Sequence, residues 1–490
     1  MRRGKFVMAW ESGVRGLTFG IPGPAMASGS EAMSLSEPVG VALVGVGGHA
    51  VTHRNALWSL QQRGLLRLLA VCEAAPDRWA TELDELRQAG VAVEPDLVSM
   101  LKRWRGKVSL VGVPVGIPGH RPVTVQVLQA GCNVVLEKPV VGCIDDFDPI
   151  LQAERQAGRA CAVHFQAIWN KTLRAVKGAL VAGKIGTLRE IRIKGRWFRE
   201  DRYYTRNAWA GQLRVGNTWV LDGTINNPFA HQVNNALFLA GCGEHSWANP
   251  LEVRAELYHA RPGITGDDTT CLAVRTDTGV DLTFAFTLCS RQPERSPVIL
   301  VFGDNGQILW PLPDGSGEIR YADGRVERIE PDNTPGSEAV YTNICNYLLG
   351  REDRVLCRLA DTLPFTQTIS AAYEAAGPPA AIGSEFVQRG GPPGKEGFVL
   401  QGVDETIDAC FETGQLFSDL GTPWAVGARC TEVGPGYRRF QPKWDVPRTT
   451  DNEPRTGVAT ATFSQTPSTA SSQPAATPCR TRRTRRGRCP

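Results

Sequence analysis

Short apolar runs alternate with segments of helical spacing through the first third of the chain. The runs lie at residues 41–44, 68–72, 107–113, 133–136 and 160–165. They are mostly apolar without alternation, as strands buried on both faces of a parallel sheet are. Segments with helical spacing, such as residues 77–89 and 122–130, lie between them. Since strands and helices that alternate in this way form right-handed crossovers, residues 38–165 predict an α/β domain with a doubly wound parallel sheet.

The hydrophobic pattern changes after residue 165. Residues 281–288 place apolar side chains at every second position, Leu282, Phe284, Phe286 and Leu288, which is typical of a half-buried antiparallel strand. Further strands are predicted at 188–198, 251–258, 269–276, 298–302, 306–310 and 317–322, and helices at 173–182, 338–349 and 361–376. A loop rich in glycine and proline is expected at 390–397. Residues 166–425 therefore predict a second domain with a mixed or antiparallel sheet and helices beside it.

Both ends of the chain differ in composition from the two predicted domains. Residues 1–37 hold four of the five methionines and no periodicity, and residues 426–490 become rich in Thr, Ser, Ala and Pro. We expect both segments to be disordered. Arg2 and Arg3 resemble a twin-arginine export signal, but charged residues interrupt the apolar stretch that such a signal needs.

Charge and cysteine usage exclude several classes of function. Six arginines lie in the last eleven residues, and without them the formal charge of +4 becomes −2. The rest of the chain therefore lacks the positive charge that a protein specific for a nucleic acid needs. No apolar stretch approaches ~18 residues, so no membrane span is predicted. Thirteen scattered cysteines without a Cys-x-x-Cys pair suit buried, reduced thiols in a cytoplasmic protein.

The first apolar strand ends in a glycine-rich turn. Gly45, Gly47 and Ala50 stand in the Gly-x-Gly-x-x-Ala arrangement, with Gly48 and His49 between the last two. The first glycine permits the tight turn, the second lets a pyrophosphate approach the backbone, and a small third residue lets helix and strand pack closely. The turn therefore predicts a dinucleotide site, in which free amides at the helix start face the phosphates.

Glu73 ends the second apolar run, 23 residues beyond Ala50. This is near the ~20 residues expected for the acid that binds the ribose hydroxyls. A carboxylate ~4 Å from a 2′-phosphate costs roughly 4 kcal/mol at an effective dielectric constant near 20. Glu73 therefore favours NAD, while Arg78 nearby leaves NADP open.

Lys138 follows the strand at 133–136, at the carboxyl edge where open α/β sheets bind their ligands. Pro139 bars the lysine backbone from the helical region, so its side chain has little conformational freedom to lose. The preceding strand, at 107–113, ends at Pro114, and His120 follows a few residues later.

These motifs together resemble the Gfo/Idh/MocA oxidoreductase family. The likeness covers roughly residues 38–425, and its specific part is Glu137-Lys138-Pro139. It implies an N-terminal Rossmann domain and a C-terminal α/β domain whose open, mostly antiparallel sheet supports the substrate pocket and often an oligomer interface. It also implies that Lys138 contacts nicotinamide ribose and substrate. By this resemblance Pro114, His120, Glu137 and Lys138 are expected at the cofactor, and the protein is expected to be a homo-oligomer, a dimer or a tetramer.

The second domain departs from the family at one position. The family carries Asp and His four residues apart at the start of a helix; His231 fits the histidine, but Asn227 stands in place of the aspartate. Asp222 is the only acid close by. Either the loop returns Asp222 to the site or the relay lacks its carboxylate. We favour the first, because Pro228 and two asparagines suggest a bent segment capped onto the helix.

The predicted reaction moves hydride between nicotinamide and a secondary alcohol or carbonyl. The hydroxyl proton must leave to a base. His231 has a suitable reference pKa, near 6.5, whereas Lys138 would need its pKa of about 10.4 lowered, or would act as a cationic donor to the oxygen. Upstream of Asp222, a loop rich in polar and aromatic groups predicts a wall for a sugar, cyclitol or similar polyol, with Tyr204, Arg206, Asn207, Trp209 and later Asn227.

Two other functions stay open at this point. One is a nucleotide-sensing regulator on the same fold, which the missing aspartate at position 227 keeps alive. The other is a lyase or glycosidase that recycles the hydride on a retained nicotinamide. A metal site is not predicted: His49 and His53 have helical i, i+4 spacing, but the sequence shows no third ligand.

Overall fold

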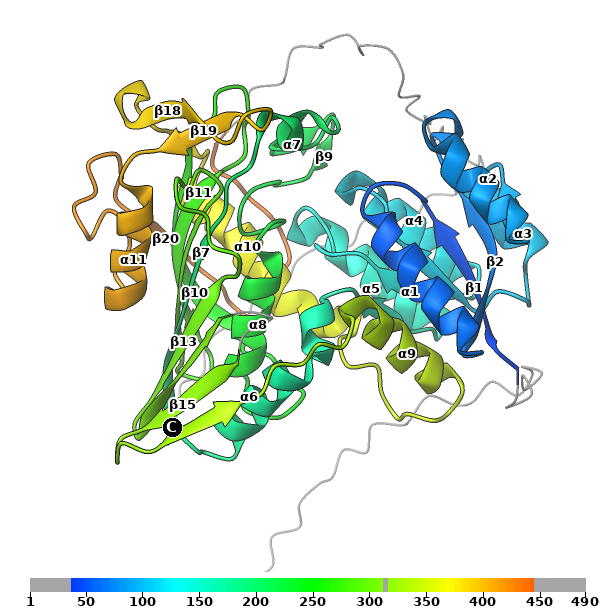
Figure 1. The fold of residues 1–490 in the computed structure, drawn as a ribbon, viewed down its shortest axis with the longest axis horizontal. Helices are drawn as coiled ribbons and strands as arrows, with labels where there is room; N and C mark the ends of the chain where they lie inside the picture. The colour runs from blue at the N-terminus through cyan, green and yellow to red at the C-terminus, as the bar shows by residue number, and fades with distance from the viewer. Residues whose placement is uncertain (1–36, 312–315, 445–490) are drawn as a thin grey trace, which may run out of the picture.

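The computed structural model describes residues 37–311 and 316–444, which form two domains side by side (Figure 1). Residues 1–36 and 445–490, for which we expected disorder, lie outside the described residues. The first domain is a six-stranded parallel sheet in the order β3-β2-β1-β4-β5-β6. Its strands are β1 (Val39–Val44), β2 (Leu66–Cys72), β3 (Ala92–Glu94), β4 (Leu110–Val113), β5 (Asn133–Leu136) and β6 (Cys161–Val163).

Helices cover both faces of this parallel sheet, as its apolar strands require. They are α1 (Ala50–Gln62), α2 (Ala80–Gln88), α3 (Leu97–Arg103), α4 (Ile117–Gln129) and α5 (Phe147–Ala157). The strands β1, β4 and β5 are buried at every position. The strand order reverses between β1 and β4, and this is the point where doubly wound sheets bind dinucleotides. The predicted Rossmann domain is confirmed.

The second domain is built on a ten-stranded sheet, seen edge-on in Figure 1. Its path runs β16-β15-β14-β13-β7-β12-β11-β10-β17, and β20 also pairs with β10. All pairs are antiparallel except β7 with β12 and β10 with β17. The strands are β7 (Leu188–Arg196), β10 (Pro250–His259), β11 (Thr269–Thr276), β12 (Asp281–Thr287), β13 (Val298–Gly303), β14 (Gly306–Pro311), β15 (Gly317–Tyr321), β16 (Val326–Ile329), β17 (Ala380–Ala381) and β20 (Arg429–Glu432). The predicted open, mostly antiparallel sheet is confirmed.

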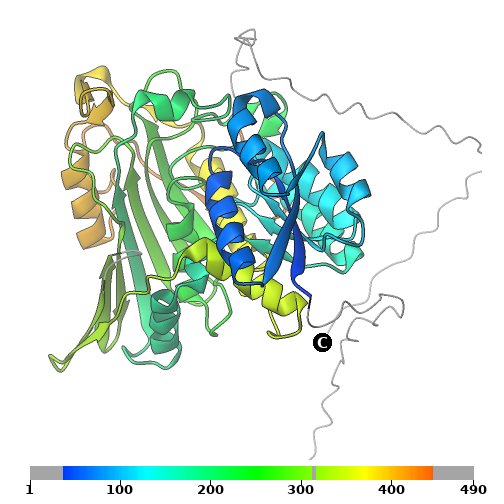
Figure 2. The same cartoon turned by 45° about the vertical axis from the view of Figure 1, so that its right-hand side comes forward.

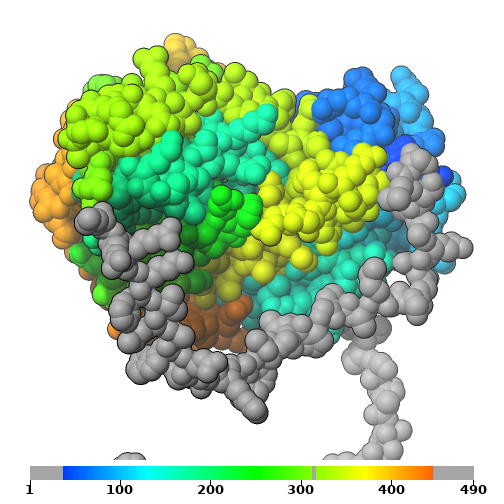
Figure 3. All heavy atoms as spheres, turned by 90° about the horizontal axis from the view of Figure 1, so that it is seen from below, coloured from blue at the N-terminus to red at the C-terminus, as the bar shows by residue number. Residues whose placement is uncertain are grey.

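One face of this sheet looks toward the first domain and carries α8 (Ala230–Ala240) and α10 (Leu363–Ala376), with α6 (Lys171–Val181) beside α8 (Figures 1 and 2). Helix α9 (Gly336–Leu348) leaves the second domain and packs on α1. Seen from below, the yellow part of the chain lies between the blue first domain and the green strands and helices of the second (Figure 3). The opposite face carries α11 (Val403–Thr413), which packs on β7 and β12.

The structure confirms one local expectation and corrects another. The loop expected at 390–397 is the turn of a hairpin, β18 (Val387–Gly390) with β19 (Gly397–Leu400). The segment upstream of Asp222 is not wholly a loop, because it holds the short helix α7 (Asp201–Thr205) and a small hairpin of β8 (Arg214–Val215) and β9 (Thr218–Trp219). These elements span only two to five residues each, too few for a hydrophobic period to show in the sequence.

The boundary predicted at residue 425 is too early, because residues 426–444 return across both domains. After β20, the Phe440 amide donates to Asp145 Oδ1 (2.8 Å), and Arg438 pairs with Asp148 of α5 (2.8 Å). The Trp444 indole then donates to the Tyr373 carbonyl of α10 (3.3 Å). Anchors that lie far apart in the sequence hold this stretch, so its composition alone does not reveal them.

Candidate active site

The glycine turn joins β1 to α1 at the carboxyl edge of the parallel sheet. Gly45 has φ +91° and Gly48 has φ +57°, both in the region that favours glycine. Gly48 faces open space, and His49, at the N-cap of α1, makes no side-chain hydrogen bond to the helix start. The first amides of α1 are therefore uncapped by side chains. This arrangement fits the pyrophosphate of a dinucleotide.

The Trp79 indole lies against Gly47. A Cβ at position 47 would come within 2.0 Å of the ring, so only glycine fits there. Trp79 ends the 3₁₀ turn Pro76–Trp79 that follows β2. The indole thus covers the turn at Gly47.

Glu73 lies next to the glycine turn, just beyond the end of β2. Its Oε2 accepts a hydrogen bond from the Val46 amide (2.8 Å) and its Oε1 one from the Ala75 amide (3.0 Å). Each carboxylate oxygen keeps a further lone pair for ribose hydroxyls. Pro114 borders the same turn, its carbonyl oxygen 3.8 Å from the Cβ position of Gly45.

Lys138 bridges the two domains from the loop after β5. Its Nζ donates to the Asn227 carbonyl oxygen and to Asn227 Oδ1, both at 3.1 Å. Burial lowers the pKa of Lys138, although the charges of Glu137 and Asp222 act in the opposite direction. The ammonium is therefore held at the cleft by an amide of the second domain.

Asp222 reaches this lysine through Asn227. Asp222 Oδ1 accepts from Asn227 Nδ2 (2.8 Å), and Oδ2 accepts from the Gly211 amide (2.6 Å). Burial raises the pKa of Asp222, with the hydrogen bond from Gly211 opposing it. The loop thus brings the acid back as the favoured alternative expected. The side chain that accepts the hydrogen bond from Lys138 is, however, Asn227 and not Asp222. The Asp222 carboxylate fixes the orientation of the Asn227 side-chain amide.

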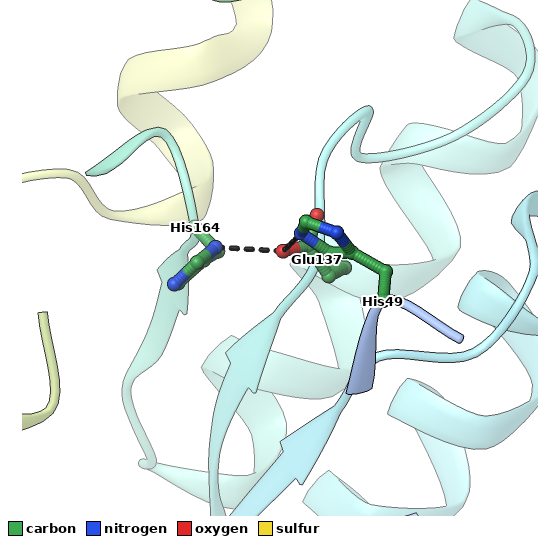
Figure 4. A group of neighbouring side chains, drawn as sticks. All are labelled: His49, Glu137 and His164. Atoms are coloured by element: carbon green, nitrogen blue, oxygen red, sulfur yellow. Dashed lines mark ion pairs between the residues drawn. The ribbon is translucent and has the colours of Figure 1, made fainter. Parts of the chain in front are cut away.

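Glu137 is buried among three imidazoles. Its Oε1 lies 3.2 Å from His49 Nε2, 3.0 Å from His53 Nε2 and 2.7 Å from His164 Nδ1, and Figure 4 shows two of these rings. Its Oε2 accepts from the Lys138 amide (2.7 Å). Burial alone would raise the pKa of Glu137, but the imidazoles hold it well below its ordinary value. The carboxylate is thereby kept charged directly behind Lys138.

His164 is the group that the sequence did not reveal. It follows β6, and its ring centroid lies 4.4 Å from that of His53. Ligand atoms of His49, Glu137 and His164 lie within 4.8 Å of one another. This group contains His49 but not His53, so it differs from the helical pair that the sequence offered. Of the three contacts to Glu137, that of His53 Nε2 has the geometry of a hydrogen bond, whereas both ring nitrogens of His164 are buried without a hydrogen-bond partner.

His231 stands at the start of α8, edge-on to Phe165 with 5.6 Å between ring centroids. Burial, and next the charge of Lys138, lower its pKa to about 3, so the ring is neutral at pH 7. Its Nδ1 is buried without a hydrogen-bond partner. The ring lines a cavity of about 340 Å³ together with polar side chains such as Gln166 and Asn235.

His120 has a structural place instead of a cofactor contact. Its Nδ1 lies 2.7 Å from the Pro139 carbonyl oxygen and its Nε2 2.9 Å from that of Val115. The ring is buried, and burial lowers its pKa. It joins the loops after β4 and β5, so the expectation that it touches a dinucleotide is replaced by a role in positioning the loop of Lys138.

The predicted substrate wall divides into two groups. Arg206 stacks on Tyr203 (3.8 Å from guanidinium carbon to ring centroid), and the Trp209 indole reaches across to Gly116 of the first domain. Asn207 turns inward, because its Oδ1 accepts from the amides of Trp209 and Ala210, and Tyr204 lies under Arg261. Arg206 and Trp209 thus border the cleft, while Asn207 and Tyr204 shape the loop.

Two family models match the chain. One, described as an oxidoreductase family with an NAD-binding Rossmann fold, matches residues 39–165, and the other, described as the GFO/IDH/MocA C-terminal domain, matches residues 173–309. Among curated proteins, D-apiose dehydrogenase of Paraburkholderia graminis is 28% identical over 151 residues, which is 30% of this chain and 37% of that protein. An uncharacterized oxidoreductase of Escherichia coli, YdgJ, is 24% identical over 161 residues, 33% of this chain and 42% of that protein. The alignment thus spans about two fifths of these relatives.

Solved structures share the fold at low identity. An oxidoreductase from Agrobacterium radiobacter in complex with NAD+, L-tartaric acid and magnesium has a TM-score of 0.58 at 18% identity, covering 69% of this chain and 96% of its own. The WlbA dehydrogenase of Bordetella pertussis in complex with NADH and UDP-GlcNAcA has a TM-score of 0.57 at 22% identity, with coverages of 69% and 97%. The aldose-aldose oxidoreductase of Caulobacter crescentus complexed with glycerol has a TM-score of 0.57 at 19% identity, with coverages of 69% and 98%.

Proposed function

Because the chain belongs to the Gfo/Idh/MocA oxidoreductase family, we propose that it is an NAD-dependent dehydrogenase or reductase acting on the CH–OH group of a sugar, cyclitol or similar polyol. The observation that carries this proposal is the hydrogen bonding of Lys138 Nζ to Asn227, across the cleft beside a glycine turn. Relatives that act on D-apiose and on aldoses support the substrate class.

NAD, when bound along the glycine turn, supplies the acceptor for hydride. Lys138 places an ammonium or amine against the reacting oxygen of the substrate. Asn227 orients it by accepting two of its hydrogen bonds, and Glu137 offsets its charge from behind. Because burial lowers the pKa of Lys138, the amine form becomes accessible, and this form takes the hydroxyl proton as hydride leaves.

His231 has a different role from the base that the sequence suggested. A ring with a pKa of about 3 holds a proton poorly at neutral pH. It can still accept or donate a hydrogen bond as a neutral imidazole. We therefore assign proton transfer to Lys138, and to His231 the orientation of a substrate hydroxyl.

Cofactor titration followed by a panel of sugars and polyols, read by nicotinamide absorbance, tests this proposal. Lys138→Ala should lower turnover at least about 100-fold, a loss near 3 kcal/mol of transition-state stabilisation, while the NAD dissociation constant stays within threefold. Lys184→Ala is the matched control, because this exposed lysine pairs with Glu327 in the second domain. Unaltered rates in Lys138→Ala would refute the mechanism.

A nucleotide-sensing regulator is the second candidate, favoured by the asparagine at position 227. NAD binding without turnover on any polyol would select it. Product formation without net NADH would select instead an enzyme that recycles the hydride for elimination or hydrolysis.

We also propose a cytoplasmic homo-oligomer. Eleven cysteines lie in the part of the chain that the structure describes; none is in a disulfide and nine are buried, as suits a reducing compartment. Within the same residues, no helix is long and apolar enough to cross a membrane. Since α11 covers the outer face of the second sheet at β7 and β12, the part of that face left for a second copy lies over β13 to β16.

A further inference from the structure

A large cavity opens at the end of the second domain where α7 meets the β18–β19 hairpin, at the top of Figure 1. Its volume is about 1110 Å³, at the upper end of the range of small-molecule sites. The walls come from the end of β7, from α7, from residues 290–295 after β12, and from the hairpin. A monosaccharide would leave part of this space empty, so the cavity has room for a substituent on the sugar.

Positive charge dominates the walls of this cavity. Two carboxylates line it, Glu200 and Glu294, against six cationic side chains: Arg199, Arg202, Arg291, Arg295, Arg389 and Lys395. Glu294 is already paired with Arg196 (2.6 Å) and Lys194 (3.5 Å) behind the wall. Arg389 is likewise paired with Asp201 of α7 (2.7 Å). Apart from these pairs, Arg199, Arg202, Arg291 and Lys395 still outnumber Glu200, and this excess of cations favours an anionic ligand.

Arg199 packs against two aromatic rings of the wall. Its guanidinium carbon lies 4.8 Å from the Trp197 ring and 5.2 Å from the Tyr203 ring. Its Nε is buried without a hydrogen-bond partner. A stacked guanidinium with a free N–H presents a fixed fork that matches a carboxylate or a phosphate.

The cavity adjoins the reaction centre. The Trp197 ring stacks on Phe229, with 4.3 Å between the ring centroids. Phe229 follows Asn227, the residue that binds Lys138, by two positions. Tyr203 lines the cavity on one side and stacks with Arg206 at the cleft on the other. A ligand anchored at Arg199 could thus extend to the lysine.

We propose that the substrate is an anionic sugar derivative, bearing a carboxylate or a phosphate that Arg199 and the neighbouring arginines bind while a hydroxyl carbon faces Lys138. This inference rests on the proposed function, because it names the substrate class of the same site. The neutral part of the substrate lies toward the cleft, and the anionic group lies between α7 and the hairpin.

Calorimetric titration of the full chain, saturated with NAD so that the glycine turn is filled, tests the proposal. The probes are D-glucose, D-glucuronate, glucose 6-phosphate and inorganic phosphate. At least one anion should bind ten times more tightly than glucose and weaken as salt rises from 50 to 300 mM. Preference for glucuronate or for the phosphates identifies the anionic group. If no anion binds better than glucose, the proposal is overturned.

Variants locate the site. Arg199→Gln and, separately, the exposed Arg291→Gln should each weaken the preferred anion at least fivefold. Arg275→Gln is the control, because this exposed arginine of β11 pairs with Glu252 and lies outside the cavity. Equal loss in all three variants, or in none, refutes the site. If NAD fails to bind, the proposed function fails, and the same titration without NAD still decides whether the arginines bind anions.

Discussion

Asp222→Asn probes the relay that replaces the family aspartate. The carboxylate offers only acceptors, one to the Gly211 amide and one to Asn227 Nδ2, so it fixes the Asn227 amide with its oxygen toward Lys138. An asparagine at position 222 has one oxygen and one NH2 group. If the NH2 group at position 222 faces Gly211, the Gly211 amide loses its acceptor. If that NH2 group faces Asn227 instead, the Asn227 side chain turns over and points its own NH2 group at Lys138.

The size of both effects follows from the cost of a buried donor without an acceptor, about 1–3 kcal/mol. Position 222 is almost fully buried, so water does not replace the lost acceptor. We expect the free energy of unfolding to fall by about 1–3 kcal/mol. In the fraction of molecules with a turned Asn227 the lysine loses its orientation, so kcat/KM should fall roughly 10–100-fold, since each factor of ten is about 1.4 kcal/mol.

The assays are urea unfolding and NADH formation at saturating NAD with the best substrate of the panel. Asp268→Asn is the matched control: Asp268 is equally buried and accepts from the Ala260 and Arg261 amides, but it does not contact Asn227. The control should lose stability and keep kcat/KM. If Asp222→Asn loses stability but keeps wild-type kcat/KM, the orientation of Asn227 does not matter and the relay is wrong.

Three further predictions follow from the first domain. Glu73 should make NADP bind at least about 100-fold more weakly than NAD, and Glu73→Gln should narrow that ratio, as measured by fluorescence titration with both cofactors; equal ratios would contradict the role of Glu73 at the ribose. Trp79→Ala should bind NAD more tightly, by up to about tenfold, because the indole no longer covers Gly47; weaker binding would show that the ring is part of the site. His53 has its pKa lowered to about 4 by burial, so the unfolded chain takes up a proton between pH 6.5 and 4 that the folded chain does not. His53 should therefore lower the free energy of unfolding by about 1.6 kcal/mol from pH 6.5 to pH 5, and His231 should add a similar loss over the same range. His53→Asn should reduce that slope of the urea-unfolding profile by about half; an unchanged slope would exclude His53 as a cause.

Sequence alone predicted the features that depend on local pattern. Continuous apolar runs gave the parallel strands, and the alternation around Phe284 gave an antiparallel one. Gly45, Glu73 and Lys138 follow the ends of parallel strands, and strand ends gather at one edge of the sheet. The sequence was therefore sufficient to expect that these three residues lie close together.

What the sequence did not predict depends on contacts between distant segments. His164 is 111 residues from His53, yet the two rings face one carboxylate. The cationic cavity likewise combines Arg199 with arginines near residues 291 and 389. His120 has a residue type that is common in active sites and follows β4, but its ring nitrogens contact backbone carbonyl oxygens. Residue type and spacing cannot separate such a histidine from a cofactor ligand.

The returning segment at residues 426–444 bears on how the cleft can open. Arg438 and Phe440 hold α5 and its preceding turn in the first domain, while Trp444 holds α10 in the second. Any swing of one domain away from the other stretches this tether, which limits hinge motion and favours entry of ligands by small loop displacements. A chain shortened to residue 425 would lose this tether, so its cleft should open more widely. Ligands should then bind and dissociate faster and be enclosed less tightly.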